Sequence, residues 1–115
     1  MIRPIRLALS LAIFATPQTA YAFDTIDISK TLGSIQCEGD SKDVPTLQRE
    51  LTEHNIPVFA ADCGSDGMMY IAVCGAPDGK IGIFTIDADD QQKAFSLGFE
   101  PLSSLASRTD CYNTP

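Results

Sequence analysis

The spacing of apolar positions predicts a first helix over about 44–54. Asp43 is a suitable N-cap residue, and Leu47 and Leu51 recur behind it at the helical period, so they would share one buried face. Pro57 lacks a backbone N–H and prevents the helix from continuing. We expect this helix to pack on a sheet formed by the segments that follow it.

A second helix is predicted to start at Asp87. Asp87 can cap it, and Asp89 and Asp90 lie in its first turn, where the helix dipole favours negative charge. Gly98 suits the left-handed conformation that ends many helices. The segment 99–105 is compatible with a last strand or with a short helical turn, and the sequence leaves both open.

Three apolar segments between these helices predict short strands at 58–63, 68–74 and 80–86. The residues that separate them, 64–67 and 75–79, are rich in Gly, Asp, Ser and Pro, a composition typical of turns. Strands joined by such short turns form an antiparallel meander. The last two segments have apolar residues at both parities, so both faces of the sheet are expected to be partly covered.

Residues 23–42 give the weakest pattern in the chain. Ile26 and Ile28 alternate as in a strand, whereas Ile28, Leu32 and Ile35 fall on one face of a helix. We favour a short helix there. The order of the predicted helices and strands along the chain indicates a small α+β domain. We expect a two-layer sandwich with an antiparallel meander sheet and two helices on one face.

The methionine and aromatic side chains are expected to supply the core. Met68 and Met69 are adjacent, so in a strand they would point to opposite faces. An exposed methionine beside Tyr70 would instead form an adaptable contact patch. We favour the core interpretation of these side chains over the contact patch.

The first 22 residues have the layout of a cleaved secretory signal peptide. Arg3 and Arg6 form a basic start, 7–15 is an apolar segment, and 20–22 reads Ala-Tyr-Ala, a typical cleavage site. The apolar segment is much shorter than the roughly 20 residues that span a bilayer. We therefore expect a periplasmic or secreted protein that has no membrane contact after cleavage.

The remainder, 23–115, is predicted to be a single acidic domain. The chain has 8 Lys and Arg against 15 Asp and Glu, and loss of Arg3 and Arg6 would change its formal net charge from −7 to −9. Such a charge repels nucleic acid and anionic membranes and suits a basic protein partner. Solubility alone also explains it, and that explanation is favoured.

Four cysteines follow the predicted signal peptide, so an oxidising compartment would pair them as two disulfides. Their spacing does not fit a zinc site or a C-x-x-C redox motif. Loop entropy does not separate the pairings. The meander places Cys63 and Cys74 at opposite ends of a hairpin, which favours the pairs Cys37–Cys63 and Cys74–Cys111.

Catalytic chemistry has little support in the sequence. The single His54 follows the first helix, where a helix C-terminus explains it, and no nucleophile or metal-ligand motif is present. We predict no catalytic residue, no metal and no cofactor. A small hydrolase that uses Asp62, Asp66 and Asp87 stays an alternative, as does a protein that binds a cation or small ligand.

The sequence therefore favours an exported, non-catalytic protein that binds another protein, as an inhibitor, an immunity factor or an accessory factor of the cell envelope. Its oligomeric state is left open. The contacts are expected at the two turns and at the start of the second helix. The predicted contact surface consists of Asp66, Met69, Asp78, Asp87, Asp89 and Asp90.

Overall fold

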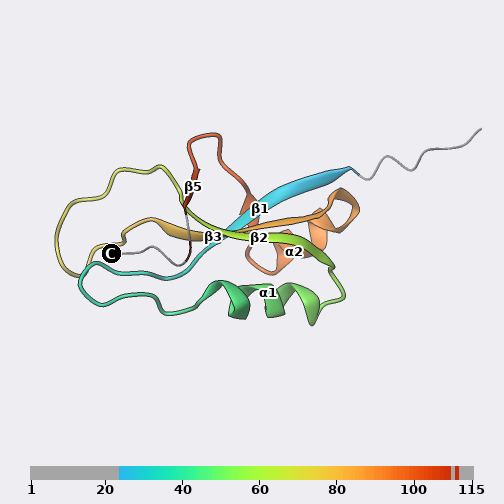
Figure 1. The fold of residues 1–115 in the computed structure, drawn as a ribbon, viewed down its shortest axis with the longest axis horizontal. Coiled ribbons are helices and arrows are strands. Elements are labelled where there is room, and N and C mark those ends of the chain that lie inside the picture. Colours follow the sequence, from blue (N-terminus) through green and yellow to red (C-terminus); the bar gives the residue numbers. More distant parts are fainter. Residues whose placement is uncertain (1–23, 110, 112–115) are drawn as a thin grey trace, which may run out of the picture.

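The computed structural model describes residues 24–109 and Cys111, so the predicted signal peptide lies outside the described residues. Its strands are β1 (Thr25–Thr31), β2 (Val58–Ser65), β3 (Lys80–Asp87), β4 (Glu100–Pro101) and β5 (Ser107–Thr109). Its helices are α1 (Val44–Thr52), a single 3-10 turn η1 (Ala88–Asp90) and α2 (Gln91–Ser96). The predicted α+β class is confirmed (Figure 1).

The strands form one antiparallel sheet in the order β4-β1-β3-β2-β5. Central β3 pairs with β1 along its whole length, from Thr25 opposite Asp87 to Thr31 opposite Ile81. On its other side it pairs with β2, with a bulge near the start of that strand. Because β1 and β2 both run antiparallel to β3, they run parallel to each other, and α1 is the crossover between them.

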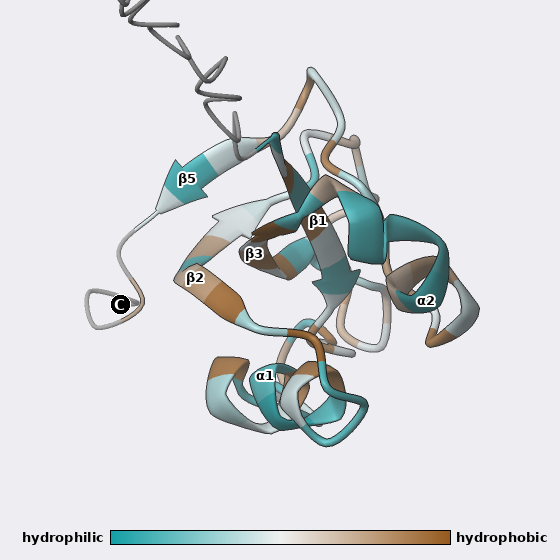
Figure 2. Cartoon of the chain, turned by 90° about the vertical axis from the view of Figure 1, so that its right-hand side faces the viewer, coloured by the Kyte–Doolittle hydropathy of each residue, from teal (hydrophilic) through white to brown (hydrophobic). Residues whose placement is uncertain are grey.

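Both helices contribute to one core on the same face of the sheet. The two leucines predicted to share the buried face of α1, Leu47 and Leu51, are fully buried there, and Ala94 joins them from α2. Phe84 of β3 and Phe99 pack edge to face with ring centroids 5.8 Å apart. Figure 2 shows α1 below the sheet, with hydrophobic and hydrophilic segments alternating along it. The other members of the core are Ile28, Leu32, Ile56 and Ile86.

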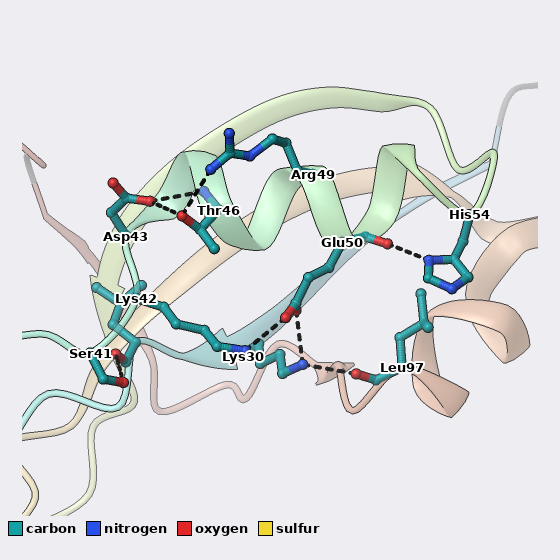
Figure 3. Close-up of polar contacts among 10 residues, drawn as sticks. Lys30, Ser41, Lys42, Asp43, Thr46, Arg49, Glu50, His54 and Leu97 are labelled. Atoms are coloured by element: carbon teal, nitrogen blue, oxygen red, sulfur yellow. Dashed lines mark hydrogen bonds and ion pairs between the residues drawn. The ribbon is translucent and has the colours of Figure 1, made fainter.

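An ion pair ties α1 to β1, and the same lysine of β1 donates a hydrogen bond to the end of α2 (Figure 3). Lys30 Nζ donates to Glu50 Oε2 at 2.9 Å and to the Leu97 carbonyl at 2.9 Å, and Lys42 Nζ donates to Glu50 Oε1 at 2.8 Å. Partial burial of Glu50 opposes ionisation, but the hydrogen bonds from Lys42 and Lys30 outweigh it and lower the pKa of this carboxyl. These contacts link three elements around one carboxylate.

The start of α1 and the C-terminal ends of both helices follow the predicted chemistry, whereas the helix predicted from Asp87 begins with the 3-10 turn η1 and is α-helical only from Gln91. Asp43 caps α1 by accepting a hydrogen bond from the Thr46 N–H at 2.9 Å, an arrangement drawn in Figure 3. The hydroxyl and backbone N–H of Thr46 lower the pKa of the Asp43 carboxyl. Asn55 and Gly98 have φ values of 61° and 92°, the left-handed conformation that follows a helix end. His54 donates a hydrogen bond from Nδ1 to the Glu50 carbonyl oxygen, with the two atoms 2.8 Å apart.

The short helix predicted within 23–42 is wrong, because this region contains β1. Ile28 is fully buried opposite Phe84, so the alternation of Ile26 and Ile28 reflects a strand. Pairing with the whole length of β3 prevails over a helical pattern that spans only two turns. Within the segment 99–105, only the two residues of β4 form a strand, so this segment is not one continuous element.

The strand predicted at 68–74 is also wrong, and this segment forms a loop. A strand in the sheet has two edges, and β3 gives one to β1 and the other to β2. No position beside β3 is therefore left for a third strand. As a result β2 and β3 are joined by a long loop, 66–79, instead of by the meander with two short turns.

The two disulfides are confirmed in number but wrong in pairing. The structure has Cys37–Cys74 and Cys63–Cys111, with Cα atoms 5.2 and 5.0 Å apart. The predicted pairs assumed that Cys74 ends a strand, whereas it lies in the loop beside Cys37. The register that places Cys63 opposite Thr109 brings Cys111 to Cys63.

Candidate functional site

The 66–79 loop carries most of the exposed large apolar side chains of the described chain. Five of the seven belong to it: Met68, Met69, Tyr70, Ile71 and Val73. Met69 is 99% exposed and Ile71 79% exposed. Figure 1 shows the loop at one end of the sheet, far from α2. A contiguous exposed apolar segment of this kind is typical of an interaction surface.

The core interpretation of Met68, Met69 and Tyr70 is therefore wrong. It depended on a strand at 68–74, in which alternate side chains would enter the interior. Outside the sheet, the same run of apolar residues faces solvent. Within it only Tyr70 is turned back toward the molecule, with 39% of its surface exposed.

Asp66 holds the first half of the loop. Its backbone N–H donates to the Gly79 carbonyl at 2.9 Å and so closes the loop at its base. Its carboxylate accepts hydrogen bonds from the Met68 N–H at 2.9 Å and from the Tyr70 hydroxyl. The hydrogen bond to Asp66 raises the pKa of the Tyr70 hydroxyl.

Gly79 makes room for these contacts. It has a φ of 80°, and a Cβ atom there would lie 2.7 Å from the Asp66 carboxylate and 2.8 Å from the Tyr70 ring. A larger residue would therefore displace the inward-facing side chains that hold the loop.

The segment 32–42 holds the second half of the loop. The Gln36 side-chain amide donates to the Ile71 carbonyl at 2.7 Å and to the Pro77 carbonyl at 3.2 Å. The Gln36 backbone bonds to Ala76 and Gly75 at 2.9 and 3.1 Å. The adjacent Cys37–Cys74 disulfide adds a covalent connection between the two segments, which lie side by side in Figure 1.

Asp78 closes the far end of the loop. Its carboxylate accepts hydrogen bonds from the Ser34 hydroxyl and from the Lys80 N–H. Burial alone would raise the pKa of Asp78, but these hydrogen bonds lower it. The loop is thus held from within at both ends and in the middle, while its apolar side chains point outward. Such preorganisation reduces the entropy cost of binding.

The six residues of the predicted contact surface fall into two separate groups. Asp66, Met69 and Asp78 lie on the 66–79 loop. Asp87, Asp89 and Asp90 lie at the opposite end of β3, where Asp87 accepts a hydrogen bond from the Asp89 N–H and caps η1. The structure therefore brings three of the six together at the loop.

The carboxylates of the hydrolase alternative lie apart along β3. Asp62 is opposite Ile83, Asp66 bonds to Gly79, and Asp87 ends the strand. Each step covers four residues of β3, or about 13 Å at the usual rise per residue. Within the described chain these three groups do not share a pocket, so paired acid-base chemistry has no geometric basis there.

Asp62 has a structural partner on the helix-free face of the sheet. Arg108 of β5 bridges Asp62 of β2 and Asp27 of β1, with N–O distances of 2.5 and 2.8 Å. Thr85 of β3 donates to the same Asp27 carboxylate at 2.6 Å. This cluster connects four strands across the sheet.

Two hollows of similar size lie on the described surface. One, of about 450 Å³, adjoins the loop and is lined by Asp66 and Met68 together with Ile81 and Ser103. The other, of about 460 Å³, lies between the start of α1 and β2. The first hollow extends the apolar surface of the loop onto the helix-free face.

Among the described residues, no three His, Cys, Asp or Glu side chains are grouped closely enough to hold a metal ion. The helices of the described chain are also too short and too polar to cross a membrane. Comparison with protein-family models, curated proteins and solved structures found no match to this chain.

Sequence reasoning missed Gln36, Ile71 and Val73 as residues of the site. The two Gly-rich and Asp-rich segments on either side of 68–74 were a usable signal, because they fit a long loop as well as two turns. No local sequence pattern indicated that Gln36 would hold the loop. Its contacts with the loop span 35 and 41 positions in the sequence.

Proposed function

We propose that this chain is an exported protein that acts by binding another protein through the 66–79 loop. The observation that carries the proposal is the contrast within the loop. Met69 and Ile71 are 99% and 79% exposed, whereas the Asp66 and Gln36 side chains bond to the loop backbone and Tyr70 bonds to Asp66. Exposed apolar side chains on a prearranged backbone favour tight binding.

Export is supported by two independent features. The first 22 residues have the basic, apolar and small-residue regions of a cleaved signal peptide. The two intramolecular disulfides suit an oxidising compartment such as a periplasm or the extracellular space. An exported protein meets partners in a compartment where a disulfide-braced loop keeps its shape.

Charge indicates the kind of partner. Glu38 and Asp40 are exposed on the segment that braces the loop, and the formal net charge of the chain is −7. Lys80 partly offsets this local charge through a 4.0 Å contact with Asp40. We expect the partner to offer an apolar pocket with basic side chains around it, which would also speed the encounter.

Site-specific photo-cross-linking tests the proposal. A benzophenone amino acid is placed at Met69 or, as a control, at Phe59, an apolar residue of β2 that is 55% exposed outside the loop. Each protein is produced with its signal peptide in its native host and irradiated in intact cells. We expect one discrete adduct from position 69, competed by unlabelled protein but not by an M69D/I71D variant.

The two positions make the result decisive. An adduct that forms with the cross-linker at position 69 and not at position 59 supports binding through the loop. The same adducts from both positions, or none from position 69, would contradict it, because a loop that contacts its partner must place Met69 within reach of that partner.

A further inference from the structure

The backbone around Met69 is as informative as its side chain. Among the described residues, no hydrogen bond uses the N–H or C=O of Met69 or of Tyr70. The nearest bonds hold the Met68 N–H on one side and the Ile71 carbonyl on the other. The Met69–Tyr70 peptide unit is thus free to pair with a partner while both of its flanks are fixed.

An exposed side chain between free backbone groups is what an endopeptidase cleft recognises. Such a cleft pairs with the extended backbone of its substrate and takes one side chain into a primary specificity pocket. Met69 is the most exposed large apolar side chain of the described chain, and it is unbranched, so it can enter a narrow apolar pocket. A flat protein surface would leave most of this side chain in water.

The braces also explain how such a segment would block an endopeptidase. On the N-terminal side, Asp66 is bonded to Gly79 at the base of the loop. On the C-terminal side, the segment is fixed by the Gln36 amide and by the Cys37–Cys74 disulfide. Because both sides are attached to the scaffold, deformation of the loop toward a cleavage transition state is costly, and the two halves would stay in place after a cut.

We propose that the 66–79 loop is a substrate-like inhibitory loop for an endopeptidase with an apolar primary pocket, and that Met69 is the residue that enters this pocket. The inference rests on the proposed function and names the partner class. Tyr70 follows the anchor but has its hydroxyl bound to Asp66, so it acts as a brace and not as a second anchor.

Inhibition kinetics with peptidases of known pocket chemistry test this inference. The oxidised protein is assayed against chymotrypsin and subtilisin, which accept large apolar side chains, and against trypsin, which requires Lys or Arg. We expect competitive inhibition of at least one of the first two, with an inhibition constant below about 1 µM, and none of trypsin at that concentration.

A specificity swap gives the decisive variant. M69K should weaken inhibition of the peptidase with the apolar pocket by about 100-fold and create inhibition of trypsin. The reason is that the side chain at position 69 alone fills the primary pocket, and trypsin requires Lys or Arg there. Phe59→Ala, outside the loop, should change the inhibition constant for neither peptidase. Since Met69 is almost fully exposed, M69K should fold normally, and its melting temperature checks this.

Three results would overturn the inference: no inhibition of chymotrypsin or subtilisin at about 10 µM, unchanged specificity in M69K, or cleavage of the Met69–Tyr70 bond as fast as in an unstructured peptide. If any of these occurs while position 69 still cross-links one competed partner, only the peptidase assignment fails. If position 69 gives no adduct either, the proposed function fails with it.

Discussion

Inward-facing polar residues fix the outward-facing apolar ones in this protein. Gln36, Asp66 and Tyr70 each satisfy a backbone or side-chain group of the loop, and none of them is part of the core. Each such hydrogen bond contributes only about 1 kcal/mol to stability. Their larger effect is to restrict the conformations of Met69 and Ile71.

Gln36→Ala should loosen the loop with little effect on the core. The variant loses the hydrogen bonds to the Ile71 and Pro77 carbonyls, so we expect a stability loss of about 1 kcal/mol and faster amide exchange between 68 and 77. Gln92→Ala, on the exposed side of α2, is the matched control. Equal exchange rates in the two variants would contradict the bracing function of Gln36.

Glu50 should make stability depend on pH in the acid range. Lys42 and Lys30 lower its pKa in the folded state, so the stabilisation is present above its ordinary value of 4.5 and is lost as the pH falls through the folded value. Glu50→Gln should therefore cost about 1–2 kcal/mol at pH 7 and almost nothing at about pH 2.

Urea unfolding at several pH values measures this difference. Glu53→Gln is the matched control, because Glu53 is exposed on the next turn and makes no side-chain hydrogen bond among the described residues. A stability difference between Glu50→Gln and the parent protein that stays constant down to pH 2 would show that the Glu50 charge is not its source.

At the scale of elements, local signals were sufficient for α1 and for the end of α2, and insufficient for the sheet and for the segment 23–42. Asp43 and Gly98 act at the helix ends where the sequence predicted them, because capping depends on neighbours in the chain. The local signals for the strand β1 and for the loop at 68–74 were ambiguous, since both outcomes depend on which strands pair with β3. That choice is made by contacts distant in sequence.

The disulfides and the site share this dependence on topology. Once β1 takes one edge of β3, Cys74 lies in a loop beside Cys37, and the apolar run before it becomes exposed. A single misassigned element therefore changed both the cysteine pairing and the interpretation of Met69. The sequence did place Asp66, Met69 and Asp78 near one another, because all three lie in or beside segments rich in Gly and Asp. In the structure the Asp66 and Asp78 carboxylates accept hydrogen bonds that hold the loop, and only Met69 is fully exposed.

The two disulfides should have separable effects. By loop closure, each contributes up to about 4 kcal/mol to stability. The double variant C37S/C74S should also speed amide exchange across 66–79, because it frees the loop from its brace. C63S/C111S should loosen β5 and leave the loop protected. Exchange measured by mass spectrometry distinguishes them, and loop exchange that rises equally in both variants would contradict this division.

At the scale of the whole molecule, the sheet separates two different surfaces. One end of β3 carries the apolar 66–79 loop, and the other carries the acidic turn of Asp87, Asp89 and Asp90. The pairing of β3 with β1 and β2 and the core beneath these strands hold the two ends apart. A scaffold that presents one apolar loop suits the proposed binding function, and a net negative charge favours solubility despite the exposed side chains.

The proposed export makes a prediction for the intact protein. Processing by a signal peptidase should leave a chain that starts at Phe23, and oxidation should reduce its mass by four hydrogen atoms. Intact-mass spectrometry before and after reduction and alkylation measures both features, and peptide mapping without reduction should recover the pairs Cys37–Cys74 and Cys63–Cys111. A retained Met1 would contradict export, because a cleaved signal peptide cannot remain on the purified chain. Free thiols in native material would contradict the braced loop instead, since without Cys37–Cys74 the loop loses its covalent connection to the scaffold.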